Sequence, residues 1–151
     1  DAGLMSEAGC PAVADPGALL VRRAHELGIR VVPLVGPSSL LLALMASGLN
    51  GQSFAFHGYL PVEAEARNRR IRDLEAESTR HARTQIFIET PYRNEHMFEA
   101  LRTHCSPATR LCIARDLTLD SEWIVTRPVA EWKKAAAPDL AKRPTVFLLL
   151  A

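Results

Sequence analysis

GLMSEAGCPAVADPG, residues 3–17, and VVPLVGPSS, residues 31–39, carry the clearest fold signals in the sequence. In each stretch a short apolar run passes into a loop rich in glycine, proline and serine. This pattern is typical of a buried strand that gives way to a helix. In open α/β sheets, ligands bind where the strands end and the helices begin. The loops Glu7–Gly17 and Gly36–Ser39 are therefore expected to line one crevice.

The segment between the two loops is predicted to be a helix between two strands. Gly3–Ser6 would end the first strand and Ile29–Val35 would form the second. Asp15 and Pro16 make a favourable helix start, because Asp caps a helix and Pro tolerates its first position. Gly28 is placed to end the helix. Strand, helix and strand at this spacing predict a parallel βαβ unit. The predicted buried face of the helix is formed by Leu19, Leu20, Ala24 and Leu27.

The remainder of the chain also alternates apolar strands with helices. A helix from Ser38 or Ser39 to Gly48 is followed by a polar turn, and the boundary between two lobes, residues 1–50 and 51–151, is predicted there. Strands are expected at residues 53–60, 84–89, 110–115, 122–126 and 145–150. Helices are expected at residues 64–79, 93–103 and 129–134.

The composition indicates an ordinary globular protein without a strong overall field. Of 151 residues, 48% are hydrophobic and 23% are charged, and the net charge is +1, so any basic surface must be local. Three cysteines without Cys-x-x-Cys or His-x-x-x-His spacing argue against a disulfide framework and a metal site. No apolar run is long enough to cross a membrane. A cytoplasmic protein with reduced thiols is the simplest interpretation.

The residues of the two loops are compatible with a ligand site, but they suit ordinary turns better. The small side chains of Ser6–Gly9 would let a ligand approach the backbone, and Glu7 is able to accept hydrogen bonds from a ribose or an amine. Ser38 and Ser39 suit a ligand carboxylate or hydroxyl beside a helix dipole, or serve only as helix caps. Taken singly, each loop is better explained as a turn or a cap.

Charged residues at two other places are candidates for binding. Arginines that open the charged helix are spaced to grip phosphates: Arg67, Arg69, Arg70 and Arg72. Acidic residues follow them directly, so a solvated helix face is the competing interpretation. Glu89–Arg93 and Arg115-Asp116 end two buried strands, where either function or a structural arginine–carboxylate pair is expected. The sequence has no Gly-x-Ser-x-Gly, Walker or Gly-x-Gly-x-x-Gly motif, which argues against hydrolase, ordinary NTPase and classical dinucleotide-binding functions.

Taken together and in order, seven stretches resemble the tetrapyrrole methylase superfamily of S-adenosylmethionine (SAM) methyltransferases. They are most similar to the branch that methylates a cytidine 2′-hydroxyl in small-subunit ribosomal RNA (methyltransferase I). The stretches are SEAGCP (6–11), ADPG (14–17), VPLVGPSS (32–39), SGL (47–49), FHGYLP (56–61), ETPYR (89–93) and ARDLT (114–118). Each is weak alone, but seven in the right order are specific and span nearly the whole chain.

This resemblance implies a fold, a cofactor and site residues. Members have two α/β lobes, with SAM in the cleft between them, and usually form dimers. It therefore implies a tetrapyrrole methylase-like α/β fold with mixed sheets flanked by helices, and a homodimer. The implied cofactor-binding positions are Ser6, Glu7, Ala8 and Gly9 in the first loop, Ser38 and Ser39 in the second, and Glu89, Cys112, Pro144 and Thr145 around the adenine.

The sequence departs from the family pattern in two places. Nothing matches the family's first strand and glycine-containing loop, so the N-terminal lobe is expected to be incomplete and SAM binding by these residues alone to be weak or absent. Ribosomal RNA members carry a basic and histidine-containing stretch after the Leu-Thr pair, whereas this chain has Leu119–Glu122. The cofactor is therefore better specified than the substrate.

Methyl transfer from a sulfonium is a direct displacement, so positioning carries much of the rate and no covalent nucleophile is needed. A ribose hydroxyl would benefit from a base, for which Glu7, Glu89 and Asp116 are equal candidates. Three hypotheses follow. The first is 2′-O-methylation of small-subunit ribosomal RNA, with the four arginines holding phosphates. The second is SAM-dependent methylation of a tetrapyrrole or another small molecule. The third is a non-catalytic interaction domain.

Overall fold

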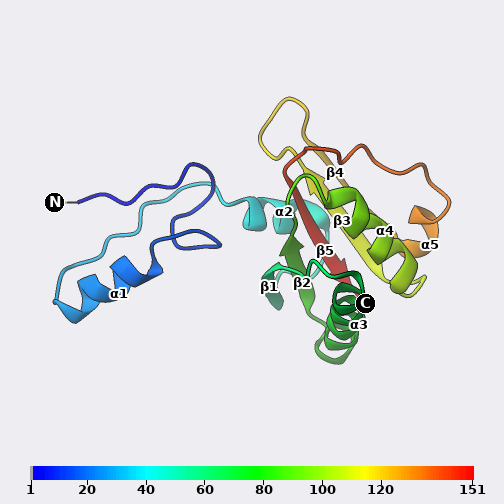
Figure 1. Cartoon of the computed structure of the whole chain (residues 1–151), viewed down its shortest axis with the longest axis horizontal. Helices are drawn as coiled ribbons and strands as arrows, with labels where there is room; N and C mark the ends of the chain where they lie inside the picture. The colour runs from blue at the N-terminus through cyan, green and yellow to red at the C-terminus, as the bar shows by residue number, and fades with distance from the viewer. Residues whose placement is uncertain (1) are drawn as a thin grey trace. The chain divides into compact units, whose positions relative to one another are not determined.

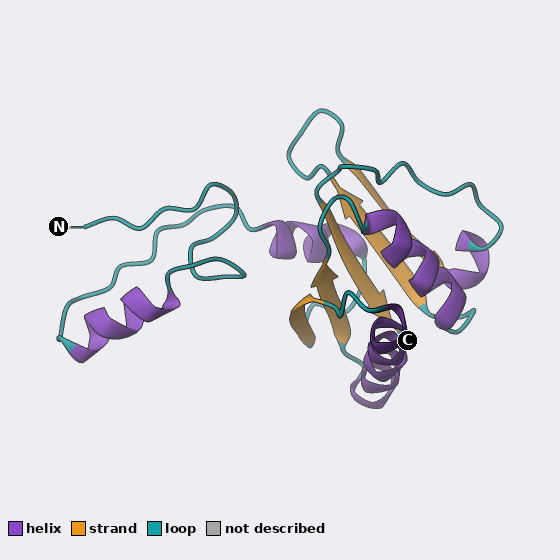
Figure 2. Cartoon of the chain, viewed as in Figure 1, coloured by secondary structure: helices purple, strands orange, loops and turns teal. Residues whose placement is uncertain are grey.

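The computed structural model describes residues 2–151 and divides the chain into two compact units, Asp1–Leu41 and Leu42–Ala151. Figure 1 colours the units by residue number, and Figure 2 shows that all the strands belong to the second unit. The predicted lobe boundary after residue 50 lies in the turn that follows helix α2 (Ser39–Ser47). A lobe boundary after residue 50 stays a prediction.

The second unit is built on a five-stranded mixed sheet with the order β1-β2-β5-β3-β4. Its strands are β1 (Phe54–Tyr59), β2 (Thr84–Ile88), β3 (Arg110–Arg115), β4 (Trp123–Pro128) and β5 (Thr145–Leu150). β1 and β2 are parallel and are joined by helix α3 (Ala64–His81), which forms a βαβ unit. β5 is antiparallel to both of its neighbours, so β1, β2 and β3 all end at the same end of the sheet.

Alternating side chains of the sheet form the core with the helices on one face. α3 lies there with α4 (Asn94–His104) and α5 (Val129–Trp132). The rings of Phe87 and Phe147 stack with centroids 5.9 Å apart. Trp132 meets Phe98 edge to face at 5.6 Å and donates its indole N–H to the backbone oxygen of Leu111 at 2.9 Å. The period-two pattern of these strands therefore builds the packed side of the sheet.

The opposite face of the sheet is also apolar, and the end of α2 reaches it. Ile86, Cys112 and Leu148 are fully buried. Thr126, which pairs with Cys112 across the β3–β4 ladder, donates its hydroxyl to the backbone oxygen of Ser47 at 2.7 Å. A strand set that is apolar on both faces is expected of a sheet covered on both sides.

Sequence-based predictions for the second unit are confirmed, with boundaries that differ by a few residues. The five predicted strands and three predicted helices all form. α3 begins where the carboxylate of Glu63 accepts hydrogen bonds from the amides of Glu65 and Ala66 at 3.0 and 2.8 Å. It ends at Ala82, which has a left-handed conformation with φ 46°. Capping at both ends explains why this polar helix of 18 residues has sharp limits.

In the first unit, the predicted strands at Gly3–Ser6 and Ile29–Val35 are wrong, because the described residues 2–41 contain no strand. A strand is stabilised by ladder hydrogen bonds to a neighbour, and no neighbouring strand lies within these residues. The side chains of Leu34 and Val35 are fully exposed accordingly, at 88% and 107%. The predicted βαβ unit is therefore reduced to its helix.

That helix, α1 (Ala18–Glu26), begins later than predicted and does not bury its apolar face. Its N-terminal cap is Gly17 rather than Asp15, because the Asp15 carboxylate instead accepts the hydroxyl of Ser6 at 2.6 Å. Gly28, with φ 67°, ends the helix as predicted. Leu19, Leu20 and Leu27 were expected to be buried, yet all are exposed, because within residues 2–41 no sheet covers them.

Candidate functional site

The structure brings together the two loops of the first unit on which the sequence analysis rests. The thiol of Cys10 donates to the backbone oxygen of Pro37 with a sulfur–oxygen distance of 3.6 Å. This contact joins Glu7–Gly17 to Gly36–Ser39. The two loops therefore meet inside one unit, although the strands that were predicted to precede them do not form. That the loops line one ligand crevice stays a prediction.

The first loop is held in a tight and strained conformation. Gly9 has φ 70°, and two residues with side chains, Ala12 and Ala14, also have positive φ, at 65° and 53°. Backbone hydrogen bonds from Ala12 to Pro16 and from Val13 to Cys10 close it at 3.3 and 3.2 Å. Left-handed conformations at alanine cost about 1 kcal/mol each and collect at ligand sites. The strain favours a binding loop over a simple connection.

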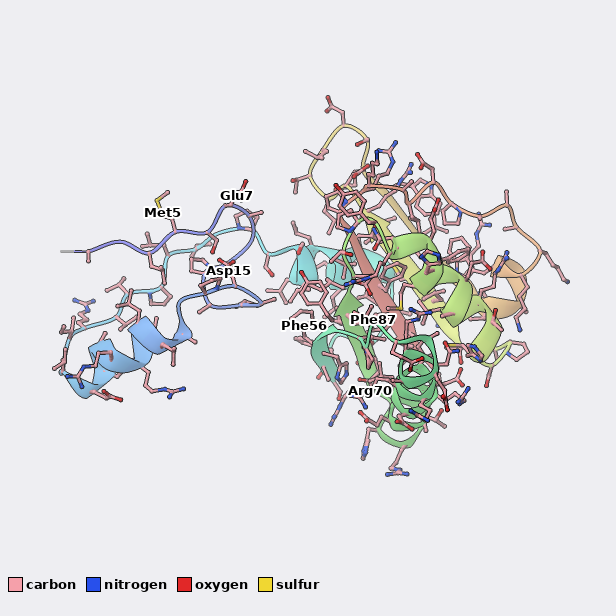
Figure 3. The ribbon with its side chains drawn as sticks, viewed as in Figure 1. Met5, Glu7, Asp15, Phe56, Arg70 and Phe87 are labelled. Carbon is pink, nitrogen blue, oxygen red and sulfur yellow. The ribbon has the colours of Figure 1, made fainter. Side chains whose placement is uncertain are left out.

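The predicted ligand-facing residues of these loops are accessible. Glu7 is exposed, and Figure 3 shows its side chain pointing outward from the loop. Ala8 and Gly9 are exposed beside it, and nothing within 4 Å would meet a side chain added to Gly9. Ser38 is half-buried, whereas Ser39 is the exposed first residue of α2. The backbone of the loop is thus open to close approach by a ligand.

A second group of functional candidates lies at the end of the sheet in the second unit. We call this region the carboxyl end of the sheet: the segments 60–63, 89–93 and 116–122 that follow β1, β2 and β3, with segment 139–144, which precedes β5. Glu89 lies here with a side chain only 1% exposed. One of its oxygens accepts hydrogen bonds from Arg93 at 2.8 and 3.0 Å and from the amide of Thr90 at 2.6 Å. Glu89 therefore folds segment 89–93 onto the end of β2.

Asn94 connects that segment to the start of β5. Its amide nitrogen donates to the backbone oxygen of Arg143 at 2.6 Å and to the hydroxyl of Thr145 at 3.2 Å. The Thr145 hydroxyl in turn donates to the oxygen of Arg143 at 3.0 Å. Asn94 is fully buried, and its side-chain oxygen has no partner among residues 2–151. The predicted pair Pro144 and Thr145 is thus fixed beside the predicted Glu89.

Asp116 anchors the loop after β3 in the same region. It is 4% exposed and has φ 53°, and its carboxylate accepts hydrogen bonds from Arg143 at 2.7 Å and from Ser121 at 3.0 Å. The pKa of Arg143 is raised above its ordinary value, first by the hydrogen bond to Asp116 and then by Asp139. Thr118, with φ 70°, is also left-handed. Strain and buried charge together mark this loop as a functional candidate.

Cys112 lies inside β3 rather than at the carboxyl end of the sheet. Its side chain is fully buried on the face that the end of α2 reaches. Burial raises the pKa of the thiol, and a hydrogen bond with Thr126 offsets that rise in part. Among the described residues, Cys112 therefore packs in the core, and its assignment to a cofactor stays a prediction.

The four arginines at the start of α3 do not form one free cluster. Arg70 donates to Glu77 of its own helix at 3.0 Å and to Nδ1 of His57 in β1 at 3.1 Å. Nε2 of the same ring lies 2.6 Å from the side-chain oxygen of Gln85, so a ring with its proton on Nε2 satisfies both contacts. Arg69 pairs with the exposed Glu65 at 2.8 Å. Arg70 is labelled in Figure 3.

The other two arginines of the set differ from each other. Arg67 donates to the backbone oxygen of Val62 at 3.2 Å, so it lies against the segment that follows β1. Arg72 is exposed and lines a hollow of about 310 Å³ with Glu75 and Thr109. Arg69 and Arg72 are therefore the two that face solvent, while Arg67 and Arg70 also organise their surroundings.

Three residues that the sequence analysis did not single out hold the carboxyl end of the sheet together. They are Asn94, Asp139 and Arg143, and their hydrogen bonds, which include those with Asp116 and Thr145, join segments far apart in sequence. Asn94 could have been found from the sequence, because it is a polar residue at the start of a predicted helix. Nothing local distinguished Arg143 from other charged residues of a loop.

Among residues 2–151, no helix has the length and apolar character needed to cross a bilayer.

Curated relatives match nearly the whole chain. "Ribosomal RNA small subunit methyltransferase I" of Pseudomonas aeruginosa is 40% identical over 139 residues, which is 92% of this chain and 48% of that protein. The protein of the same name from Xylella fastidiosa is 37% identical over 147 residues, which is 97% of this chain and 52% of that protein. The chain thus spans about half the length of the curated relatives it matches. No family model matches the chain.

Solved structures share the fold. A cobalamin biosynthetic enzyme, cobalt precorrin-4 methyltransferase, superposes with a TM-score of 0.56 and 18% identity, over 94% of this chain and 61% of that one. At this identity the likeness concerns the fold alone. The α/β fold of the tetrapyrrole methylases, expected from the seven sequence stretches, is confirmed.

Proposed function

We propose that this chain forms part of a SAM-dependent methyltransferase of small-subunit ribosomal RNA. The proposal starts from the family of the chain, which belongs to the ribosomal RNA small subunit methyltransferase I proteins. The observation that carries the proposal is the 40% identity over 92% of the chain. The tight contact of the two loops through Cys10 and Pro37 supports it, because a cofactor loop must be held in one shape.

The loops of the first unit are proposed to hold the methionine part of SAM. Ser6–Gly9 offers an open backbone, and Ser38 and Ser39 offer hydroxyls at the start of α2, where the helix dipole favours a carboxylate. Glu89, Cys112, Pro144 and Thr145 are proposed for the adenine end. When bound, SAM supplies the electrophilic methyl group, and the role of these residues is to orient it toward the accepting oxygen.

The carboxylates differ in how free they are to act as a base. Glu89 and Asp116 each accept hydrogen bonds from an arginine, at 2.8 and 2.7 Å, so taking a proton would disrupt an existing ion pair. Glu7 makes no ion pair among the described residues and points outward (Figure 3). We therefore place the proton acceptor for a ribose hydroxyl at Glu7, with Glu89 and Asp116 as positioning residues.

SAM binding tests the cofactor assignment. Gly9→Val forces a β-branched residue into φ 70°, so we expect SAM affinity measured by calorimetry to fall about tenfold. Gly51→Val is the matched control, because Gly51 lies in open space without a positive φ. Equal SAM affinity in the two variants would remove the first loop from the site. Absence of SAM binding by the whole protein that carries this sequence would support the non-catalytic interaction domain instead.

RNA binding tests the substrate assignment. The charge-reversed variant Arg69→Glu with Arg72→Glu, which changes the two arginines that face solvent, should weaken RNA binding. It should also reduce the slope of log affinity against log salt by about 0.7 for each phosphate of a single strand that the arginines no longer neutralise. Arg102→Glu, which removes a surface pair with Glu99 on α4, is the control. An unchanged slope would exclude the α3 arginines from the RNA site. Preference for a tetrapyrrole over RNA would favour the small-molecule hypothesis.

The proposal extends to location and assembly. We propose a cytoplasmic protein, where Cys105 and Cys112, both buried and reduced, remain thiols. We also propose a homodimer, as the family resemblance implies. Sedimentation at micromolar concentration tests the assembly, and a single monomeric species would overturn it.

A further inference from the structure

Many cations of the second unit are concentrated at one end of its sheet. We call this region the amino end of the sheet: segments 51–53, 80–83, 105–110 and 127–134, with residues 150–151. β1, β2 and β3 begin there, while β4 and β5, which are antiparallel to β3, end there. Glu131 is the one acidic residue in these segments. Their six arginines and lysines are Arg80, Arg83, Arg110, Arg127, Lys133 and Lys134.

Hydrogen bonds join the segments around the end of α3. The side chain of Arg83 donates to the hydroxyl of Ser53 at 3.4 Å, and its backbone oxygen accepts the hydroxyl of Ser78 at 2.8 Å. The Ser78 hydroxyl in turn accepts the amide of Ala151 at 2.9 Å. The segments before β1 and β2 are therefore fixed beside the end of β5.

Strand pairing continues this surface to the other edge of the sheet. Arg110, the first residue of β3, pairs with Leu150 of β5 on one side and with Pro128 of β4 on the other. The amide of Val129, which opens α5, donates to the oxygen of Thr109 at 2.9 Å. The two lysines follow α5 directly. The six cations thus stand on segments that contact one another in an unbroken series.

A hollow shows that α3 and segment 105–110 border the same solvent. Its volume is about 310 Å³, and Thr79, Ser106 and Ala151 are among the residues that line it. Arg72 and Glu75 line it as well, and the Glu75 carboxylate accepts the amide of Ser106 at 2.7 Å. With these two residues included, seven cations stand against two carboxylates.

The six cations of the amino end have no acidic partner. Within residues 2–151, none of them forms an ion pair, and Arg127 instead lies over the ring of Trp132, 5.2 Å from its centroid. Arg83 and Arg127 are half-buried, and the other four are exposed. The ion pairs of the second unit use other arginines: Arg69, Arg70, Arg93, Arg102, Arg115 and Arg143.

The two ends of the sheet therefore differ in charge. At the carboxyl end, Arg93 is paired with Glu89 and Arg143 with Asp116. The exposed acidic residues of that end are Glu63, Asp120, Glu122 and Asp139. In Figure 1 the mark C, at the amino end, and the yellow loop after β3 stand at opposite ends of the sheet. The net charge of +1 for the whole chain hides this separation, and unpaired like charges are stabilised by an anionic partner.

We propose that the amino end of the sheet binds phosphates of the RNA substrate, away from the nucleotide that is methylated. The inference rests on the proposed function and adds to it a second RNA contact, which fixes the position of the RNA without reading its sequence. Arginine forks match phosphate oxygens, and four of the six cations are arginines. β3 has six residues, so this contact lies about 20 Å from the carboxyl end of the sheet.

The test measures binding of a labelled fragment of small-subunit ribosomal RNA to the whole protein that carries this sequence, by fluorescence anisotropy between about 0.1 and 1 M salt. The variant Arg80→Gln with Arg110→Gln and Lys134→Gln removes three exposed cations. If each contacts one phosphate of a single strand, the slope of log affinity against log salt falls by about 2. Over a tenfold range of salt, that change weakens binding about 100-fold at the lower concentration.

A control and a second variant keep the test specific. Arg22→Gln with Arg23→Gln and Arg30→Gln removes three exposed arginines of the first unit, so it changes the net charge equally and should leave the slope unchanged. Lys133→Gln with Lys134→Gln alters no strand and should lower the slope by about 1.4. The lysine variant decides the question if the triple variant does not fold.

The outcomes separate this inference from the proposed function. If the unmodified protein binds the RNA and the amino-end variants keep its slope, this surface is refuted while the RNA substrate stands. An equal fall in the first-unit control would assign the effect to net charge and also overturn the proposal. Binding to phosphatidylserine vesicles that the amino-end variants lose, with RNA binding kept, would assign the surface to a membrane instead. If the unmodified protein binds no RNA, both proposals fail.

Discussion

The ion pair between Glu89 and Arg93 should stabilise the fold far more than an ordinary surface pair. Glu89→Gln keeps the shape of the side chain but removes its charge. The side chain is 1% exposed and accepts two hydrogen bonds from Arg93 and one from the Thr90 amide. Charge-assisted hydrogen bonds exceed neutral ones by about 1 kcal/mol each. Because Arg93 is 35% exposed and partly solvated, we expect a total loss of about 2 kcal/mol.

Urea denaturation followed by tryptophan fluorescence measures this loss, because Trp123 and Trp132 both lie in the second unit. A loss of about 2 kcal/mol lowers the melting temperature of a domain of this size by roughly 4–8 °C. Glu99→Gln is the matched control, since Glu99 pairs with Arg102 at 2.7 Å on the surface of α4 and should cost under about 0.5 kcal/mol. Equal losses in the two variants would refute the anchoring role of Glu89.

Three further predictions concern the thiols, the α3 cap and the core. At pH 8 a thiol reagent should modify the half-exposed Cys10 quickly. Burial raises the pKa of Cys105 to about 12, so Cys105 should react only when the protein unfolds. Fast reaction of both thiols would contradict the burial of Cys105. Hydrogen bonds to backbone amides lower the pKa of Glu63 below 4.5, so its contribution to stability should be present above that pH and lost as the pH falls below its folded pKa. Glu63→Gln should lack this component in pH-dependent melting curves, and an identical pH profile would exclude the cap. Trp132→Phe should lower the free energy of unfolding by about 2–3 kcal/mol, because it removes a backbone hydrogen bond and core volume, whereas a change under about 0.5 kcal/mol in urea denaturation would contradict its packing.

The elements of the second unit were predictable because each carries its own local signal. Thr145–Leu150 is a continuous apolar run, and it becomes the central strand of the sheet. The helix that follows β1 begins beside its predicted start at residue 64, where Glu63 caps it. These features depend on neighbours in sequence, so sequence reasoning reaches them.

The strands of the first unit were not predictable in the same way. Ile29–Val35 has the composition of a buried strand, but a strand needs a partner, and residues 2–41 provide none. Apolar composition shows that a segment is suited to a buried strand. Whether the strand forms depends on a partner strand that lies far away in the sequence. The same limit explains why the contact between Cys10 and Pro37, across 27 residues, followed only from the order of the motifs.

The candidate site was partly predictable for a related reason. Glu89, Asp116 and Thr145 were identified from strand ends or family resemblance, and the structure places them at one end of the sheet. Arg143 was missed because its partner Asp116 is 27 residues away and Asn94 is 49 away. Ion pairs of this range leave no periodic signal in a sequence.

The decisive measurement for the proposed function is transfer of a labelled methyl group from SAM to small-subunit ribosomal RNA by the protein that carries this sequence. The account predicts label in the RNA, located on a ribose 2′-oxygen and therefore found in an alkali-resistant dinucleotide. The Pseudomonas aeruginosa relative is the reference for the same assay. Label on a tetrapyrrole but not on RNA, or no label with either substrate while the reference protein is active, would contradict the account.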